Sequence, residues 1–238
     1  MSVQEKINLQ DLSHQISGLD LPASLSSLAK QFQGKTVFSS SFSYEDQVIS
    51  HEILSNAIPI DIFTLDTGRL FPETYAVWNS TNDRYHTKVR AYYPQAEAVE
   101  NFVASHGPNS FYTSLQNRKD CCHLRKVAPL KRALAGRELW VTGLRAEHSA
   151  NREDLQQLEW DDINQVIKYH PLLNWSTEMV VNHIRRHNIP YNSLHDKGFV
   201  SIGCAPCTRA IQPGEDFRAG RWWWEDADKK ECGLHASN

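Results

Sequence analysis

The chain has 238 residues, and 25 Lys and Arg against 28 Asp and Glu give a net charge of −3. This length suits one large domain or one domain with an appendage, and 40% hydrophobic residues can fill its core. No stretch approaches ~18 consecutive apolar residues, and the polar start lacks a signal-peptide layout, so we expect no membrane association, a cytoplasmic location and reduced cysteines. The near-neutral charge also argues against a nucleic-acid binder.

Apolar residues at helical spacing predict helices up to a stop at Gly34. Beyond Gly34, short strand-like runs alternate with helical runs. The expected strands cover 35–41, 60–66, 87–92, 138–144 and 165–172. The expected helices cover 45–55, 73–85, 125–136 and 176–188, the last with Ser176 as its N-cap. Alternating strands and helices predict an α/β fold, a mainly parallel sheet with flanking helices.

Composition divides the chain into three segments. We expect an N-terminal helical segment over 1–34 and an α/β nucleotide-binding domain over 35–192. The remainder, 193–238, is rich in Gly, Pro, Cys and Trp without a clear period, and predicts a loop-rich C-terminal segment.

Three turns should follow strands at the carboxyl edge of this sheet, where parallel sheets bind ligands. They read SSSFSYED, LDTGRLFP and TGLRAEHSANR. Their hydroxyls, acids and arginines suit a polar anionic ligand, and the first leads into a helix N-terminus, which favours anions. The glycines and lysine of a Walker loop are missing, so we do not expect an ordinary P-loop ATPase.

Four of the five cysteines form two close pairs. Cys121 and Cys122 are adjacent, and Cys204 and Cys207 form a C-A-P-C motif. Two such pairs can supply four thiolates, which both zinc and a [4Fe–4S] cluster accept. Adjacent residues chelate one ion awkwardly, whereas neighbouring cysteines can bind different irons of a cubane, so the spacing favours the cluster. A zinc site, a redox dithiol and ordinary half-buried thiols are the alternatives.

Basic residues gather in the second half of the chain. Seven Lys and Arg against two Glu give 7 − 2 = +5 between Cys121 and Arg152, on a chain that is acidic overall. Arg218 and Arg221 lie three residues apart just before a Trp run and suit a guanidinium clamp for phosphate or sulfate. The fifth cysteine, Cys232, follows two lysines that favour its thiolate, so it suits a nucleophile, with an ordinary surface thiol as the alternative.

Six motifs follow in order from about Val37 to His235: SFSYEDQVI, LDTGRLFPETY, CCHLRKVAPLKRAL, WVTGLRAEHSANR, GCAPCTRAIQPGEDFRAGRWWWE and KKECGLH. They resemble the assimilatory adenylyl-sulfate and phosphoadenylyl-sulfate reductase family, in its iron–sulfur-containing bacterial branch. The resemblance implies a fold of the adenine-nucleotide α-hydrolase (PP-loop) type. The chain departs from the family at Ser43 and Tyr44, where a loop usually reads SFG-x-ED, and at Ala146 and His148 in the arginine turn.

The resemblance also implies roles for individual residues. The ligands of a [4Fe–4S] cluster would be Cys121, Cys122, Cys204 and Cys207. Cys232 would be the catalytic nucleophile, and Lys126 would lie close to the cluster and reach toward the sulfate. The implied substrate-binding residues are Ser41, Ser43, Glu45, Asp46, Asp66, Thr67, Gly68, Arg145, Arg152, Arg218 and Arg221.

The implied reaction is the reduction of adenylyl sulfate to sulfite and AMP. The Cys232 thiolate would attack the sulfate sulfur to form S-sulfocysteine, and thioredoxin or a glutaredoxin-like dithiol would then release sulfite. The alternatives are a 3′-phosphorylated substrate, use of both substrates, a tRNA-thiolating PP-loop enzyme and a non-enzymatic iron–sulfur sensor. The oligomeric state is left open, a homo-oligomer included.

Overall fold

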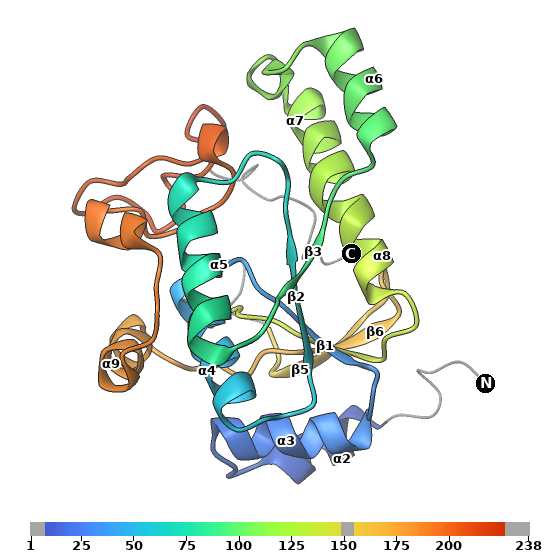
Figure 1. The fold of residues 1–238 in the computed structure, drawn as a ribbon, viewed down its shortest axis with the longest axis vertical. Helices are drawn as coiled ribbons and strands as arrows, with labels where there is room; N and C mark the ends of the chain where they lie inside the picture. The colour runs from blue at the N-terminus through green and yellow to red at the C-terminus, as the bar shows by residue number, and fades with distance from the viewer. Residues whose placement is uncertain (1–7, 149–154, 227–238) are drawn as a thin grey trace.

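A computed structural model describes residues 8–148 and 155–226. Its strands form one sheet in the order β3-β2-β1-β4-β6-β5 (Figure 1). The strands are β1 Thr36–Ser39, β2 Asp61–Leu65, β3 Arg90–Tyr92, β4 Leu139–Val141, β5 Leu158–Asp161 and β6 Val166–Tyr169. All pairs run parallel except β5 with β6, which confirms the predicted mainly parallel α/β sheet.

Helices flank the sheet within the described residues. They are α2 Leu9–Ile16, α3 Leu21–Gln31, α4 Tyr44–Ser55, α5 Pro72–Tyr85, α6 Ala96–His106, α7 Leu115–Cys122, α8 Ala128–Leu134 and α9 Thr177–His187. The sequence pattern predicts most of them but misses α6, α7 and the edge strand β5. None of the described helices is both long enough and apolar enough to cross a membrane, and the expected cytoplasmic location stays a prediction.

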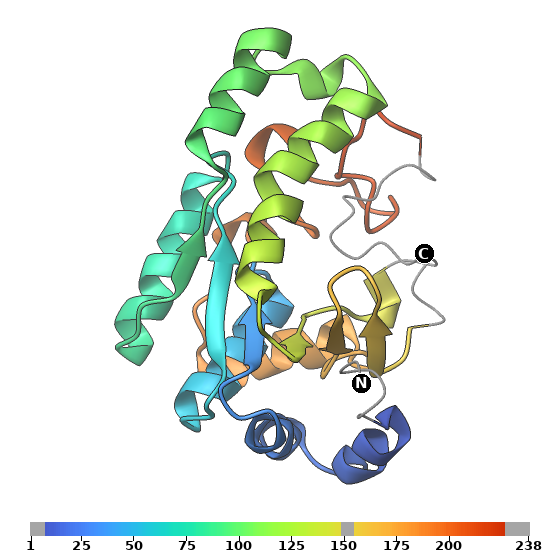
Figure 2. The ribbon, with the colours of Figure 1, turned by 90° about the vertical axis from the view of Figure 1, so that its right-hand side faces the viewer.

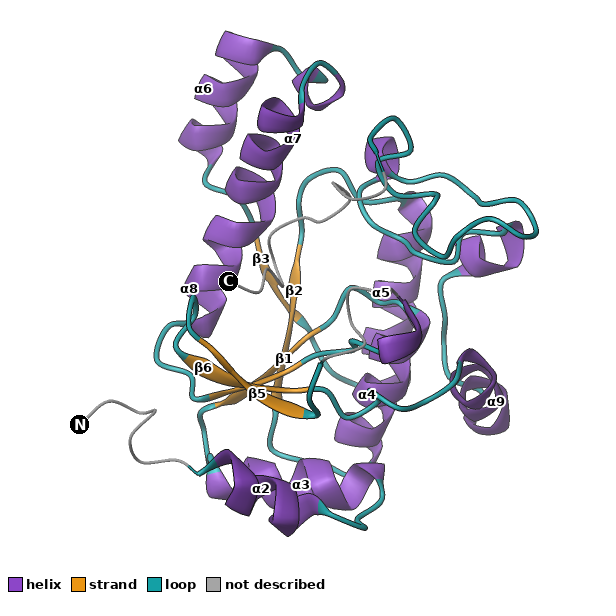
Figure 3. Cartoon of the chain, turned by 180° about the vertical axis from the view of Figure 1, so that it is seen from behind, coloured by secondary structure: helices purple, strands orange, loops and turns teal. Residues whose placement is uncertain are grey.

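Alternation along the strands gives the sheet two apolar faces. Phe38 of β1 belongs to a core shared with α2, α3, α4 and α9, whereas its neighbour Val37 packs with α8. Trp140 of β4 likewise lies on the α8 side, between two residues of the other core. This period of two is the burial pattern of a sheet covered on both faces. Figure 3 shows the sheet between α8 on one side and α4 and α5 on the other.

Side-chain caps determine where the helices that position the site begin. Ser43 precedes α4 and accepts a hydrogen bond from the Asp46 amide at 3.4 Å. Ser176, the predicted N-cap, precedes α9 and accepts one from the Met179 amide at 3.1 Å. Such caps satisfy amides that have no partner within the helix.

The strand order places a crevice at the carboxyl ends of the central strands. The chain leaves β1 toward β2 on one side, and β4 lies on the other, so helices diverge beyond these strand ends. Figure 2 shows β2 pointing toward the end of the molecule where α7 and the C-terminal segment lie. In its described part, the loop-rich segment predicted after residue 192 contains two short 3-10 turns, Ser193–Lys197 and Ala205–Cys207, and an isolated antiparallel bridge between Thr208 and Arg221.

Candidate functional site

One cavity lies at the carboxyl ends of β1, β2 and β4, and we call it the main cavity. It is lined by eight of the predicted site residues: Ser41, Ser43, Glu45, Asp46, Thr67, Lys126, Arg218 and Arg221. They come from the turn after β1, the turn after β2, the segment before α8 and the C-terminal segment. The structure therefore brings together residues that are up to 180 positions apart.

The serine turn after β1 is held by a buried carboxylate. Asp46 accepts hydrogen bonds from the Ser41 amide at 2.6 Å and from the Ser41 hydroxyl at 2.7 Å. Phe42 has a φ of 59°, which reverses the chain and buries its ring against Trp78. The turn therefore presents Ser41 and Ser43 at the N-terminus of α4, where amides and the helix dipole favour an anion.

Burial raises the pKa of Asp46 to about 6, against the hydrogen bonds from Ser41 that lower it. The Asp46 carboxylate also leaves no space for a side chain just beyond the end of β4. A Cβ on Gly143 would lie 2.2 Å from Asp46 Oδ1, so only glycine fits there. Gly143 lines the main cavity as well, and the sequence analysis missed it.

The turn after β2 is shaped by Asp66 and Gly68, which do not line the main cavity. Asp66 is buried and accepts hydrogen bonds from the Gly68 amide at 2.8 Å and the Tyr75 hydroxyl at 2.9 Å. Gly68 has a φ of 70°, which favours glycine. Only Thr67 of this predicted trio lines the cavity, so Asp66 and Gly68 act by holding its turn.

Arg145 does not line the main cavity and is fully buried beneath it. Its guanidinium donates to Glu45 Oε1 at 3.0 Å, to the Trp175 carbonyl at 2.8 Å and to the Thr177 hydroxyl at 2.9 Å, and it also contacts Glu147. Arg145 thus joins the start of α4 to the start of α9 and orients Glu45, which does line the cavity.

Arg218 and Arg221, predicted as an anion clamp, line the same cavity. The Arg221 guanidinium lies over the Trp222 ring, 4.7 Å from its centroid, and its buried Nε has no hydrogen-bond partner among the described residues. A Cβ on Gly203 would lie 2.4 Å from Arg221 Nη2, so glycine leaves the space for this cation. A buried cation with an unsatisfied donor suits an anionic ligand.

The four paired cysteines meet in a second, smaller cavity, which we call the cysteine cavity. It is lined by Cys121, Cys122, Cys204 and Cys207 together with Arg69, Arg118, Arg125 and Lys126, as well as Phe111 and Pro206. None of these four cysteines forms a disulfide. Burial raises the pKa of Cys121, and it raises that of Cys207 to about 12. Buried thiols surrounded by cations are a donor set for a group that binds thiolates.

Lys126 lines both cavities. It lies in a π-helical segment, His123–Val127, between α7 and α8. The Ala128 amide donates to the His123 carbonyl, and Pro129 has no amide to continue the α-helical pattern. Cys122 and Lys126, four residues apart, lie on one side of this continuous helical stretch, and both line the cysteine cavity.

Two further contacts join the cavities. Arg125 Nη1 donates to the Thr67 carbonyl at 2.7 Å, and the Thr67 hydroxyl lies 3.3 Å from Cys204 Sγ. In the sequence Arg125 is one of many basic residues, and nothing in its motif indicates a backbone partner 58 positions away. Two predicted site residues, Arg152 and Cys232, lie outside the described residues.

Comparisons with known proteins relate the chain to one family. Residues 35–210 match the family described as phosphoadenosine phosphosulfate reductase domain. A protein named adenosine 5'-phosphosulfate reductase from Burkholderia cepacia is 50% identical over 201 residues, covering 84% of this chain and 80% of that protein. One of the same name from Agrobacterium fabrum is 43% identical over 236 residues, covering 99% of this chain and 90% of that protein.

Solved structures give the same fold. Phosphoadenylyl-sulfate reductase from Candida auris, in a phosphate complex, matches with a TM-score of 0.72 and 26% identity, over 86% of this chain and 98% of that one. Yeast FAD synthetase matches with a TM-score of 0.54 and 18% identity, over 85% of this chain and 68% of that one. The second likeness concerns the fold alone and agrees with the predicted PP-loop type.

The buried Asp46 predicts a specific pH dependence of stability. Between the ordinary carboxyl pKa near 4 and its folded value of about 6, the folded state holds a proton that the unfolded state has lost. This group therefore makes the free energy of unfolding fall as pH rises from about 4 to 6. The free energy of unfolding of Asp46→Asn, minus that of wild type, should therefore rise as pH increases from about 4 to 6. Urea denaturation at each pH measures it. Asp162→Asn, at an exposed position, is the control. If the free energy of unfolding of Asp46→Asn changes with pH in the same way as that of wild type, the prediction is wrong.

Proposed function

This chain belongs to the phosphoadenosine phosphosulfate reductase family, and from that premise we propose that it reduces adenylyl sulfate to sulfite and AMP in sulfate assimilation. The proposal rests above all on Lys126, which lines both the main cavity and the cysteine cavity. A cation at that position can offset the negative charge of a sulfate that lies between a nucleotide in the main cavity and a group held by the cysteines.

We propose that the main cavity binds the nucleotide. The hydroxyls of Ser41 and Ser43 at the N-terminus of α4 would donate to its phosphate, and Arg218 and Arg221 would hold the phosphate and sulfate. The Arg221 Nε without a partner supports this assignment, since an oxyanion would satisfy it. Arg152 would add a further cation, as the family resemblance implies.

We propose that Cys121, Cys122, Cys204 and Cys207 hold a [4Fe–4S] cluster. The residues fit this group because four cysteines without a disulfide line one cavity, and cations that would offset an anionic cluster surround them. When bound, the cluster would supply a fixed anionic group beside Lys126 and need not change its redox state.

We propose that Cys232 is the nucleophile. Its thiolate would attack the sulfate sulfur, the bond between that sulfur and the phosphate oxygen would break, and AMP would leave, which forms S-sulfocysteine. Attack by an anion on an anion is unfavourable, and Lys126 with Arg218 and Arg221 would offset the repulsion. A thioredoxin dithiol, or a glutaredoxin-like one, would then attack Cys232 Sγ and release sulfite. Its second thiol would close the disulfide and complete the two-electron reduction.

Adenylyl sulfate is favoured over its 3′-phosphorylated form by the relatives. Those at 43–51% identity are named adenosine 5'-phosphosulfate reductases, whereas the solved phosphoadenylyl-sulfate reductase is 26% identical. Use of the phosphorylated substrate, or of both, is the second candidate. A tRNA-thiolating enzyme or a non-enzymatic sensor has no counterpart among these relatives.

The cluster proposal predicts the metal content. Anaerobically purified protein should contain about four iron and four acid-labile sulfide per chain. Cys122→Ser should lose most of both, because one ligand of the buried set is gone. One zinc per chain, with no sulfide in the wild-type protein, would contradict the cluster.

The position of Lys126 predicts its effect on the reaction. Lys126→Ala should lower kcat about 10²–10³-fold, the cost of removing one charge-stabilising donor, and leave the iron content unchanged. Lys131→Ala, at an exposed position five residues further along, is the matched control and should stay within about twofold of wild type. The rate of sulfite release is measured for both variants and for wild type. Equal rates for the two variants would show that Lys126 has no role in the chemistry.

A further inference from the structure

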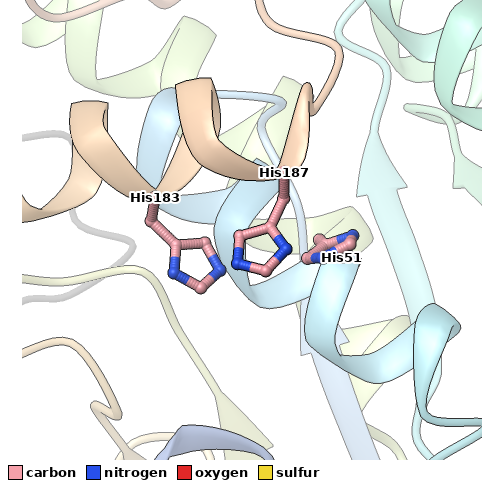
Figure 4. Close-up of side chains that lie close together, drawn as sticks. All are labelled: His51, His183 and His187. Atoms are coloured by element: carbon pink, nitrogen blue, oxygen red, sulfur yellow. The ribbon is translucent and has the colours of Figure 1, made fainter.

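Three histidines gather where α4 packs against α9, on elements away from the cysteines. His51 lies on α4, and His183 and His187 lie four residues apart on α9. Figure 4 shows the three rings side by side, with His187 between His183 and His51. Each offers one nitrogen, and these nitrogens all lie within 4.8 Å of one another. Histidines four residues apart on a helix face the same side, so two ligands from one helix and one from its neighbour converge.

Neighbouring groups orient His51 as a ligand would need. Its Nδ1 lies 2.9 Å from the Tyr85 hydroxyl and 3.0 Å from the Ser55 hydroxyl. Those contacts occupy Nδ1 and leave Nε2 for another partner. Metal-binding histidines are generally fixed in this way, by a hydrogen bond at the other ring nitrogen.

A carboxylate lies beside the three histidines. Glu52 Oε1 lies 2.9 Å from His183 Nε2, while Asn56 Nδ2 donates to Glu52 Oε2 at 3.0 Å and holds the carboxylate in place. An acidic side chain that can bond to a ligand histidine is therefore next to the three rings.

We propose that His51, His183 and His187, with Glu52 beside them, bind a divalent late transition ion, Zn²⁺ first among them. Imidazole nitrogens suit zinc, copper and nickel, and zinc commonly takes four ligands of nitrogen, sulfur or carboxylate type. Tetrahedral zinc holds nitrogen ligands roughly 3.3 Å apart, so the three rings, now within 4.8 Å of one another at their nitrogens, would draw closer around the ion.

The site would link α4, whose first turn lines the main cavity, to α9, which packs against it. Arg145 joins the start of α4 to the start of α9 through Glu45 and Thr177. The histidines join the same two helices further along, beyond Glu45 and Asp46 of the cavity wall. A bound ion would therefore stabilise the packing of α9 on α4 without contacting the main cavity.

The test is Zn²⁺ binding by the iron-loaded protein, purified without a histidine tag. Wild type should bind Zn²⁺, and its melting temperature should rise by about 5 °C or more in excess metal. His183→Gln and His187→Gln should each weaken binding at least about tenfold and lose most of the rise. His106→Gln, at an exposed position on α6, is the matched control and should behave as wild type. Circular dichroism of each variant shows whether it is folded.

Cobalt binding identifies the ligands. Co²⁺ should give the ligand-field bands of nitrogen and oxygen coordination in wild type and His106→Gln, and these bands should be lost in His187→Gln. Equal Zn²⁺ affinity in wild type and the folded His183 and His187 variants would overturn the proposal. Thiolate-to-cobalt charge transfer in place of the nitrogen and oxygen bands would also overturn it, since the ion would then be on cysteines.

Discussion

The hydrogen bond from Arg125 to the Thr67 carbonyl, 2.7 Å long and buried, joins the parts on which the site depends. It holds the turn after β2 against the helix that bears Cys121 and Cys122. Thr67 in turn contacts Cys204 of the C-terminal segment, so three distant parts of the chain meet at one point. A charge-assisted bond of this kind is strong when buried, and its loss would leave a buried cation unpaired. The wall between the main cavity and the cysteine cavity is built on it.

Charge is sorted in space on a chain that is nearly neutral overall. Arg69, Arg118, Arg125 and Lys126 surround the sulfurs, although the net charge is −3. The buried Arg118 is balanced by Glu225 at 2.7 Å, and Arg145 is balanced by Glu45. Lys126, at the shared wall, and Arg221, with its unsatisfied Nε, lie where an anionic substrate would supply the counter-charge. Arg118 and Arg145 are thus neutralised within the protein, whereas Lys126 and Arg221 line the cavity where a ligand would bind.

Local patterns predicted the elements well, because strands such as β1 alternate between two apolar cores and Ser176 caps its helix. β5 was missed because it is a four-residue antiparallel edge strand with two acidic residues. Motifs predicted which residues share the main cavity, but could not show that Arg145 is buried under it or that Asp66 only shapes a turn. Those differences depend on tertiary contacts, as does the need for glycine at Gly143 and Gly203, which local sequence does not encode. The roles of Arg152 and Cys232 stay predictions.

The most direct test of the proposed reaction is sulfite release by anaerobically purified protein with a thioredoxin system. Adenylyl sulfate and its 3′-phosphorylated form should be compared side by side, for wild type and Cys232→Ser. We expect strong preference for adenylyl sulfate by wild type and no sulfite from Cys232→Ser. Preference for the phosphorylated substrate would contradict the substrate assignment, and sulfite from Cys232→Ser would contradict the nucleophile. No sulfite from either substrate, with iron present, would contradict the reductase function itself.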